Sequence, residues 1–283
     1  AISILTTFGI LFSILFEAIE FFQLRSFWYF LTGTIWSPGV ANSQFGALPI
    51  FAGTFVITII ALLVAIPIGL GSAIYMSEYA SPKFRDYLKP ILEILAGIPT
   101  VVYGFFAAIT VAPLVVKAAA FFGLEATFNS ALASGIVMGI MIIPLISSLS
   151  DDVIRAVPDS QRKAAFALGM THGETIKNIV IPSAMPGIIS ASLLALSRAL
   201  GETMIVVMAA GLRPNLSWNP LEDMTTVTVT IVNSLVGDFE FNSPETLSAF
   251  ALGLVLFIVT LILNMISLSL IRKFKEKYKV NTL

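Results

Sequence analysis

The segment SASLLALSRALGETMIVVMAAG, residues Ser190–Gly211, is apolar over a length that can cross a lipid bilayer, yet it carries two full charges near its middle. Arg198 and Glu202 are four residues apart, so on one continuous helix they would project from the same face and could pair. A charge at the centre of a spanning helix costs about 2.5–3.5 kcal/mol on insertion scales and usually faces a cavity or a partner. The pair therefore indicates a translocation site for an ion, and a purely structural ion pair is the alternative.

The composition of the whole chain is that of a membrane protein. Of its 283 residues, 57% are hydrophobic and 12% are charged, with a mean hydropathy of +0.93, whereas a soluble domain has about 25% charged residues. The net charge of −1 and the lack of a basic stripe give no case for nucleic-acid binding. The sequence has no cysteine, no histidine–carboxylate cluster with metal-ligand spacing and no Gly-Lys dipeptide, hence no thiolate metal site, no expected metal and no P-loop.

Six segments reach the length of about 20 apolar residues that a spanning helix needs, which predicts an all-α, polytopic membrane protein. They are Ile2–Phe21, Ile50–Tyr75, Leu92–Val116, Leu132–Leu149, Gly187–Gly211 and Leu247–Ile271. The second and third contain helix breakers such as Pro67 and Pro99. Lipid tolerates these only where other helices or a water-filled cavity satisfy the freed backbone groups, so they fit either tight helix packing or a role in gating.

The positions of the basic residues predict the orientation in the membrane. Most of the 16 lysines and arginines lie in the loops after the second and fourth spans or after the last span: Lys83, Arg85, Lys89, Arg155, Arg162, Lys163, Lys177, Arg272, Lys273, Lys275, Lys277 and Lys279. By the positive-inside rule this side is cytoplasmic. Six spans then place both termini in the cytoplasm. The chain divides into residues 1–49, with the first span and a loop, residues 50–272, with the other spans, and a basic tail at 273–283.

Two longer loops lie on the opposite side. The segment Phe22–Pro49 is rich in aromatic residues, as is usual at a membrane interface. The segment Leu212–Thr246 is acidic, which suits either a docking surface for another protein or a merely solvated loop. Within it, Thr225–Val232 alternates threonine with apolar residues, and this pattern fits either a strand or an interfacial helix.

The loop at about residues 151–182 has the signals of two short helices, predicted at Gln161–Leu168 and from Thr171 to Val180. The residues that carry these signals are Asp159 or Ser160 as the first cap, Gly169 as a helix end, and Thr171 with Glu174 as a capping box. An ordinary helical hairpin has the same signals, so local physics alone does not assign a function to this loop.

The same loop resembles a known motif. Ala164-Ala165, Gly169 and Ile179-Val180-Ile181-Pro182 follow the spacing of the EAA loop of ABC-importer permeases, EAA-x3-G-x9-I-x-LP, although Lys163 replaces the Glu and Ile181 replaces the Leu. In that family the loop is a coupling helix that seats in a cleft of the ATPase subunit. The resemblance therefore implies ATPase contacts by Lys163, Ala164, Ala165, Gly169 and His172.

Two further stretches narrow the resemblance. LEILAGIPTVVYG (Leu92–Gly104) and SRALGETM (Ser197–Met204) are similar to the phosphate-specific (Pst) importer permeases, more to the C-type than to the A-type subunit. The resemblance covers about residues 44–272. It implies the type I ABC importer permease fold and a permease subunit of an ATP-driven phosphate importer in the bacterial inner membrane. It also implies an A-type second permease, two ATPase subunits that bind ATP and Mg, and an extracytoplasmic phosphate-binding protein, with no cofactor in this chain.

The candidate residues suit such a substrate. A guanidinium such as that of Arg198 offers a planar fork of donors for the oxygens of phosphate. Glu202 can hold the arginine in place, or keep the anion from binding too tightly, since transport requires release. Glu93, near the cytoplasmic end of the third span, either lines the pathway or snorkels to the interface. The alternatives are a permease for sulfate or molybdate, an ATP-independent secondary transporter, against which the EAA-like loop argues, and a membrane scaffold, which would not need charges in its core.

Overall fold

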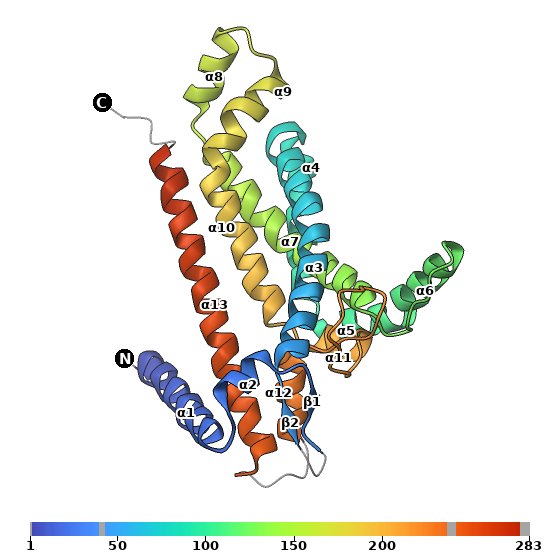
Figure 1. Cartoon of the computed structure of the whole chain (residues 1–283). Helices are drawn as coiled ribbons and strands as arrows, with labels where there is room; N and C mark the ends of the chain where they lie inside the picture. Colours follow the sequence, from blue (N-terminus) through green and yellow to red (C-terminus); the bar gives the residue numbers. More distant parts are fainter. Residues whose placement is uncertain (1, 40–42, 237–241, 278–283) are drawn as a thin grey trace. The chain divides into compact units, whose positions relative to one another are not determined.

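The computed structural model describes residues 2–39, 43–236 and 242–277, and these residues are almost entirely helical (Figure 1). The elements in chain order are α1 (Ile2–Leu24), α2 (Phe27–Thr32), β1 (Trp36–Ser37), β2 (Gln44–Phe45), α3 (Leu48–Ile74), the π-helical turn η1 (Tyr75–Tyr79), α4 (Pro82–Gly97), α5 (Thr100–Phe106), the π-helical turn η2 (Ala107–Val111), α6 (Ala112–Phe121), α7 (Ala131–Arg155), α8 (Asp159–Ala167), α9 (His172–Thr175), the π-helical turn η3 (Ile176–Val180), α10 (Ile181–Leu200), α11 (Met204–Ala209), α12 (Val227–Val236) and α13 (Pro244–Lys277). Strands β1 and β2 form a single antiparallel pair, in which Trp36 lies opposite Phe45.

Six helical stretches in the described part of the chain are long and apolar enough to cross a membrane. They are Ile4–Leu24, Leu48–Tyr79, Thr100–Phe121, Ala131–Arg155, His172–Leu200 and Pro244–Lys273. The predicted all-α, polytopic class and the number and order of the spans are therefore confirmed. Two of the predicted spans, the third and the fifth, have wrong boundaries, and both errors affect the candidate site.

The third span begins at Thr100 rather than at Leu92. A proline restricts the residue before it to extended conformations, and Ile98, which precedes Pro99, has φ −63° and ψ 130°. The chain therefore leaves the helix after Gly97 and separates α4 from α5. Glu93 lies on α4, where it is exposed, so its predicted place in the third span is wrong.

The fifth span ends at Leu200 and does not reach Gly211. Glycine is disfavoured inside a helix, and Gly201 begins a break that lasts until α11 starts at Met204. The span instead extends in the other direction, through α9, η3 and α10. A single continuous helix that carries Arg198 and Glu202 on one face, as predicted from their spacing, is therefore wrong.

The chain forms two compact units. The first contains residues 1–59, 100–137 and 200–261. Its core is aromatic at one end, where the ring of Phe21 meets the edges of Phe30 and Phe45, with ring centroids 5.4 Å apart in both pairs. All three side chains are buried, and their edge-to-face contacts are of the kind that aromatic rings prefer.

Residues 60–99, 138–199 and 262–283 make up the second unit. Its core joins the end of α3 to α7 and to η3 and α10, through Ala73, Ile154, Val157, Val180, Ala184 and Ile188. Gly69 allows α3 to approach α7 closely, because a Cβ at this position would lie 2.9 Å from the Cβ of Ile146. This helix breaker of the second span thus serves tight packing.

The alternating segment Thr225–Val232 is helical, since α12 begins at Val227. The buried hydroxyl of Thr54 accepts a hydrogen bond of 3.0 Å from the amide of Val227 and donates one of 2.8 Å to the carbonyl of Ile50. One side chain thereby satisfies an amide that the first turn of a helix leaves without an intrahelical partner.

Candidate functional site

Arg198 lies in the last turn of α10, where a cation interacts favourably with the helix dipole. One of its guanidinium nitrogens, Nη2, lies 3.9 Å from the sulfur of Met141 on α7. The side chain is exposed in the isolated chain. Since α10 is part of a candidate span, an exposed charge here requires a partner subunit or a water-filled pathway around it.

Glu202 has a different environment, since it is only 3% exposed. Its Oε1 accepts hydrogen bonds from the amides of Met204 and Ile205, at 3.2 and 3.5 Å, which are amides of the first turn of α11 without an intrahelical partner. The N-cap residue itself, Thr203, makes no side-chain capping hydrogen bond. Its backbone carbonyl accepts a 2.7 Å hydrogen bond from the hydroxyl of Thr228 at the start of α12. The carboxylate therefore has a structural role in the break between α10 and α11, and its predicted role towards Arg198 stays a prediction.

The start of α12 adds polar groups that the sequence analysis did not assign. The hydroxyls of Thr226 and Thr228 lie 3.1 Å apart. The hydroxyl of Thr225 is buried and makes no hydrogen bond within the described residues. The alternation of threonine with apolar residues was the available signal, but it does not indicate which hydroxyls approach Glu202.

The α8–α9 segment, Asp159–Thr175, forms the predicted pair of short helices (Figure 1). The capping box is confirmed, because the amide of Thr171 donates to Glu174 at 2.8 Å and the amide of Glu174 lies 3.4 Å from the Thr171 hydroxyl. Gly169 has φ +81°, a left-handed conformation typical of a helix end, as predicted. Two details were wrong. Pro158, not Asp159 or Ser160, precedes α8, and the second helix continues beyond Val180 into α10.

The predicted ATPase-contact residues divide into two groups. Lys163, Ala164 and Gly169 are exposed, whereas Ala165 is 3% exposed and faces the interior. His172 is exposed but also holds α9 against η1. Its Nε2 lies 3.2 Å from the carbonyl of Glu78, and its ring meets the edge of Tyr79 with centroids 5.1 Å apart.

Leu168, which the sequence analysis did not include among the contact residues, is 79% exposed in the turn that follows α8. A leucine just before a helix-ending glycine in a polar loop was the signal that could have singled it out. Exposure of so large an apolar side chain costs free energy in water, but single exposed apolar residues are common on protein surfaces, so exposure alone does not assign Leu168 a contact with another protein.

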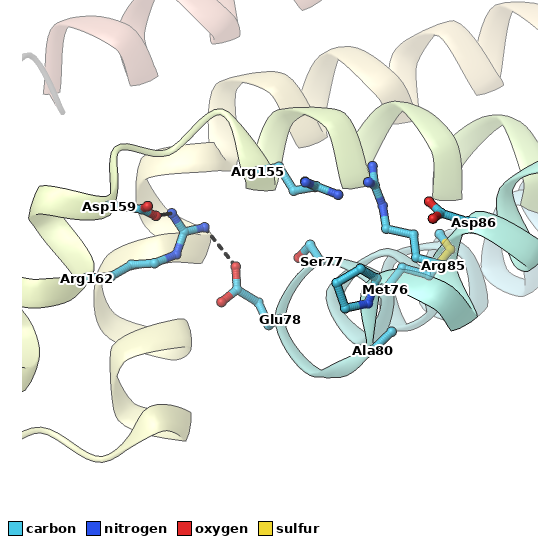
Figure 2. Close-up of a pocket in the computed structure, with 10 residues that line it drawn as sticks. Met76, Ser77, Glu78, Ala80, Arg85, Asp86, Arg155, Asp159 and Arg162 are labelled. Carbon is cyan, nitrogen blue, oxygen red and sulfur yellow. Dashed lines mark hydrogen bonds and ion pairs between the residues drawn. The ribbon is translucent and has the colours of Figure 1, made fainter.

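A cavity of about 630 Å³ lies beside this segment, and charged side chains form most of its wall (Figure 2). Its lining residues include Glu78, Arg85, Asp86, Arg155, Asp159 and Arg162. Two ion pairs join α4 to α7: Arg85 with Asp151 at 2.7 Å and Lys89 with Asp152 at 3.0 Å. The charged groups of this region therefore chiefly hold helices together.

The model of the family described as binding-protein-dependent transport system inner membrane component matches residues 65–279. The chain belongs to this family. The permease is also 35% identical over 251 residues to the probable ABC transporter permease protein YqgH of Bacillus subtilis, covering 89% of this chain and 78% of that one. It is 35% identical over 252 residues to the phosphate transport system permease protein PstC of Mesorhizobium japonicum, covering 83% and 75%.

Solved structures confirm the fold that was predicted, that of type I ABC importer permeases. The permease aligns to a chain of the bacterial alginate ABC transporter, in complex with its alginate-bound periplasmic protein, with a TM-score of 0.62 over 94% of this chain and 91% of that one. For the MetNI methionine ABC transporter the TM-score is 0.55 over 81% and 94%. Both are 15% identical in sequence to the permease, so they establish the arrangement of helices alone.

Replacing Glu202 tests whether its carboxylate acts through hydrogen bonding or through charge. We expect Glu202→Gln to keep part of the transport activity, because the amide oxygen can still accept from the amide of Met204. Glu202→Ala should lose more, since a side-chain hydrogen bond lost from the first turn of a helix costs about 0.5–2 kcal/mol and frees the chain between α10 and α11. Uptake is measured for both variants across pH in proteoliposomes. Equal loss in both, with a matching pH dependence in the parent protein, would instead mean that Glu202 carries a proton.

The acidic loop between α11 and α12 is ordered around Glu222. Its carboxylate accepts from the side-chain amides of Asn215 at 2.8 Å and Asn219 at 3.0 Å, and its carbonyl accepts from the amide of Ala131 at 3.0 Å. The hydrogen bond from Asn215, followed by those from Asn219 and Ser217, lowers the pKa of Glu222. Asp238 and Glu240, part of the same acidic pattern, lie outside the described residues.

This loop should therefore loosen in acid. Because the pKa of Glu222 is depressed in the folded protein, its contribution is complete above the ordinary glutamate pKa of about 4.3 and is lost as the pH falls through the lower folded value. Trp218 lies within the loop, so its fluorescence, with Trp28 and Trp36 replaced by phenylalanine, should change below about pH 4.3. The same acid transition in a Glu222→Gln variant would contradict this assignment.

Proposed function

We propose that this permease is the C-type transmembrane subunit of an ATP-driven importer of inorganic phosphate. The observation that carries the proposal is the exposed guanidinium of Arg198 in a spanning helix of a chain whose relatives include phosphate transport permeases. Phosphate near neutral pH carries between one and two negative charges. A planar fork of donors binds such an oxyanion through paired, charge-assisted hydrogen bonds.

The chemical energy comes from partner subunits in this proposal. In the proposed complex two ATPase subunits bind ATP and Mg, and the permease chain itself binds no cofactor. The exposed face of the α8–α9 segment, with Lys163, Ala164 and Leu168, docks on one of them. Closure of the ATPase pair then draws the segment towards the symmetry axis of the complex and reorients the spans from inward- to outward-facing.

The remaining assembly follows from the orientation of the chain. The basic loops support a cytoplasmic position for the α8–α9 segment and both termini in a bacterial cell, and with it an outer position for the acidic α11–α12 loop. An extracytoplasmic phosphate-binding protein delivers the anion there. A second permease of the A type completes the pathway, and the exposed Arg198 faces that shared space rather than lipid.

Arg198 and Glu202 have separate tasks in this scheme. The arginine contacts the anion, whereas the buried carboxylate shapes the break in the chain that follows α10. A binding site inside a transporter must also release its ion. The position of Arg198 at the end of α10, rather than in the middle of a continuous helix, allows the guanidinium to move as the break opens and closes.

The test is uptake by the complete complex in proteoliposomes, with ATP inside and the binding protein outside. We expect ATP-dependent uptake of phosphate in preference to sulfate and molybdate, each offered at the same concentration as phosphate. Uptake of sulfate or molybdate in preference to phosphate would move the assignment to another oxyanion. Uptake that continues without ATP would favour a secondary transporter.

A further inference from the structure

We propose that Arg162 and Glu78 form the link through which movement of the α8–α9 segment reaches the spanning helix α3. Arg162 is on α8 and Glu78 is in η1, the π-helical turn that continues α3. The proposal rests on the proposed ATP-driven function and names the residues that transmit its driving movement within this chain.

Arg162 and Glu78 form a short, partly buried ion pair (Figure 2). Nη2 of Arg162 lies 2.8 Å from Oε1 of Glu78, and the two side chains are 16% and 5% exposed. Such a pair interacts far more strongly than a surface pair, because little water screens it. The loss of Arg162 leaves the carboxylate of Glu78, which is only 5% exposed, without this charged partner. The loss of Glu78 leaves Arg162 with the exposed Asp159 at 3.5 Å as an ion-pair partner.

The same guanidinium also hydrogen-bonds to backbone carbonyls at the end of α7. It donates to the carbonyl of Ile154 at 3.0 Å and to the carbonyl of Val157. Arg162 thus ties three elements at one point: α7, α8 and η1. Lysine has a single ammonium group and cannot reproduce this planar fork of donors.

The second helix of the segment reaches the same residue of η1. Nε2 of His172, at the start of α9, lies 3.2 Å from the backbone carbonyl of Glu78. Glu78 is therefore held twice, by α8 through its carboxylate and by α9 through its carbonyl. A displacement of either helix acts on this one residue.

Glu78 lies at the end of a spanning helix, so its contacts with α8 and α9 can act on that helix. η1 is the last turn of the candidate span Leu48–Tyr79, and Ala80 after it is extended. A force on Glu78 therefore acts at the very end of a spanning helix. π-Helical turns are often found at functional sites and lack the regular hydrogen-bond register of an α-helix, so this turn is a place where such a helix can adjust.

The other ion pairs near the cavity do not make this connection. Arg85 and Lys89 join α4 to α7, and Asp159 contacts Arg162 at 3.5 Å from within α8 itself. Among the ion pairs of the described residues, only that between Arg162 and Glu78 joins the α8–α9 segment to the end of α3. Asp159 is 82% exposed as a side chain, which makes it a matched control for the charge around Arg162.

The experiment measures ATP hydrolysis and phosphate uptake in the same proteoliposomes, for the parent complex and for Glu78→Gln, Arg162→Gln, Arg162→Lys and Asp159→Asn. We expect the two Gln variants to hydrolyse ATP at near the parent rate while phosphate transported per ATP falls about tenfold, within the range of about 5–150-fold that coupled sites show. Arg162→Lys should lie between these and the parent. Asp159→Asn should match the parent.

Two outcomes overturn the proposal. One is an unchanged ratio of phosphate to ATP in Glu78→Gln and Arg162→Gln. The other is an equal loss of hydrolysis and uptake in all variants of the pair, which a merely structural role would produce. Measurements on the parent complex distinguish a failure of this proposal from a failure of the proposed function. If the parent complex imports a different oxyanion, the ratio of transported anion to ATP is measured with that anion. If its uptake needs no ATP, the proposed function itself is wrong.

Discussion

Replacing Arg198 with glutamine is expected to abolish ATP-driven phosphate uptake while the complex still assembles. The side chain is exposed at the end of α10, so its removal leaves no cavity in the core. Its removal also takes away the favourable interaction of a cation with the helix dipole, which is worth about 0.3–1 kcal/mol. The substrate loses hydrogen bonds to a charged group worth about 1.5–3 kcal/mol each, which predicts a fall in uptake of roughly 100-fold.

Two further variants sharpen this test. Arg198→Lys should also be impaired, because a point charge does not replace a fork that binds two oxygens at once. Arg213→Gln removes the same charge from an exposed position in the α11–α12 loop and should transport normally. Uptake is measured in proteoliposomes, and assembly by co-purification with the partner subunits. Normal uptake by Arg198→Gln would remove this residue from the pathway.

The spans were predictable because their signal is length and mean hydropathy, which local sequence carries in full. Mean hydropathy does not detect short breaks in a helix. The break between Leu200 and Met204 is only three residues long, which is too short to mark a boundary in a hydropathy window of about 19 residues. The carboxylate of Glu202 stabilises the break, because it accepts hydrogen bonds from the first amides of α11. The sequence analysis treated Glu202 only as a partner of Arg198 and therefore missed this role.

The start of the third span is a different case, since the sequence did contain the signal. Pro99 disfavours the helical conformation at Ile98. Weighing this proline as a helix boundary, rather than as a breaker inside one span, would have separated α4 from α5. Glu93 would then have been assigned to a charged helix outside the membrane-spanning set.

The α8–α9 segment shows where local prediction ends. The capping box of Thr171 and Glu174 and the left-handed Gly169 depend on neighbours in sequence, and both were predicted. The contact between Arg162 and Glu78 joins residues 84 positions apart. No local pattern specifies such a pair, because its partner is chosen by the tertiary packing. The burial of Ala165 beside the exposed Ala164 likewise depends on which face of α8 packs on the rest of the unit.

Replacing Leu168 with aspartate is expected to block docking of the ATPase subunit and so to abolish uptake. Leu168 is 79% exposed in the turn between α8 and α9. If it enters the ATPase cleft, burying its side chain contributes about 1.5–3 kcal/mol. An unpaired carboxylate in the same place adds a desolvation penalty of its own, so the affinity of the ATPase should fall by more than about 100-fold, since 1.4 kcal/mol corresponds to a factor of ten. Co-purification of the ATPase measures this loss.

The chain offers matched controls for the docking claim. Leu168→Met conserves volume and should keep both docking and uptake, whereas Leu216→Asp, at an exposed leucine of the α11–α12 loop, should leave ATPase binding unchanged. Because the sequence has no cysteine, single cysteines report contact directly. A cysteine in place of Ala164 should react with thiol reagents only when the ATPase has been removed, whereas one in place of Trp218 should react in both states. Equal reactivity of the cysteine at position 164 in the free and assembled permease would show that this face does not dock, because a seated coupling segment excludes the reagent.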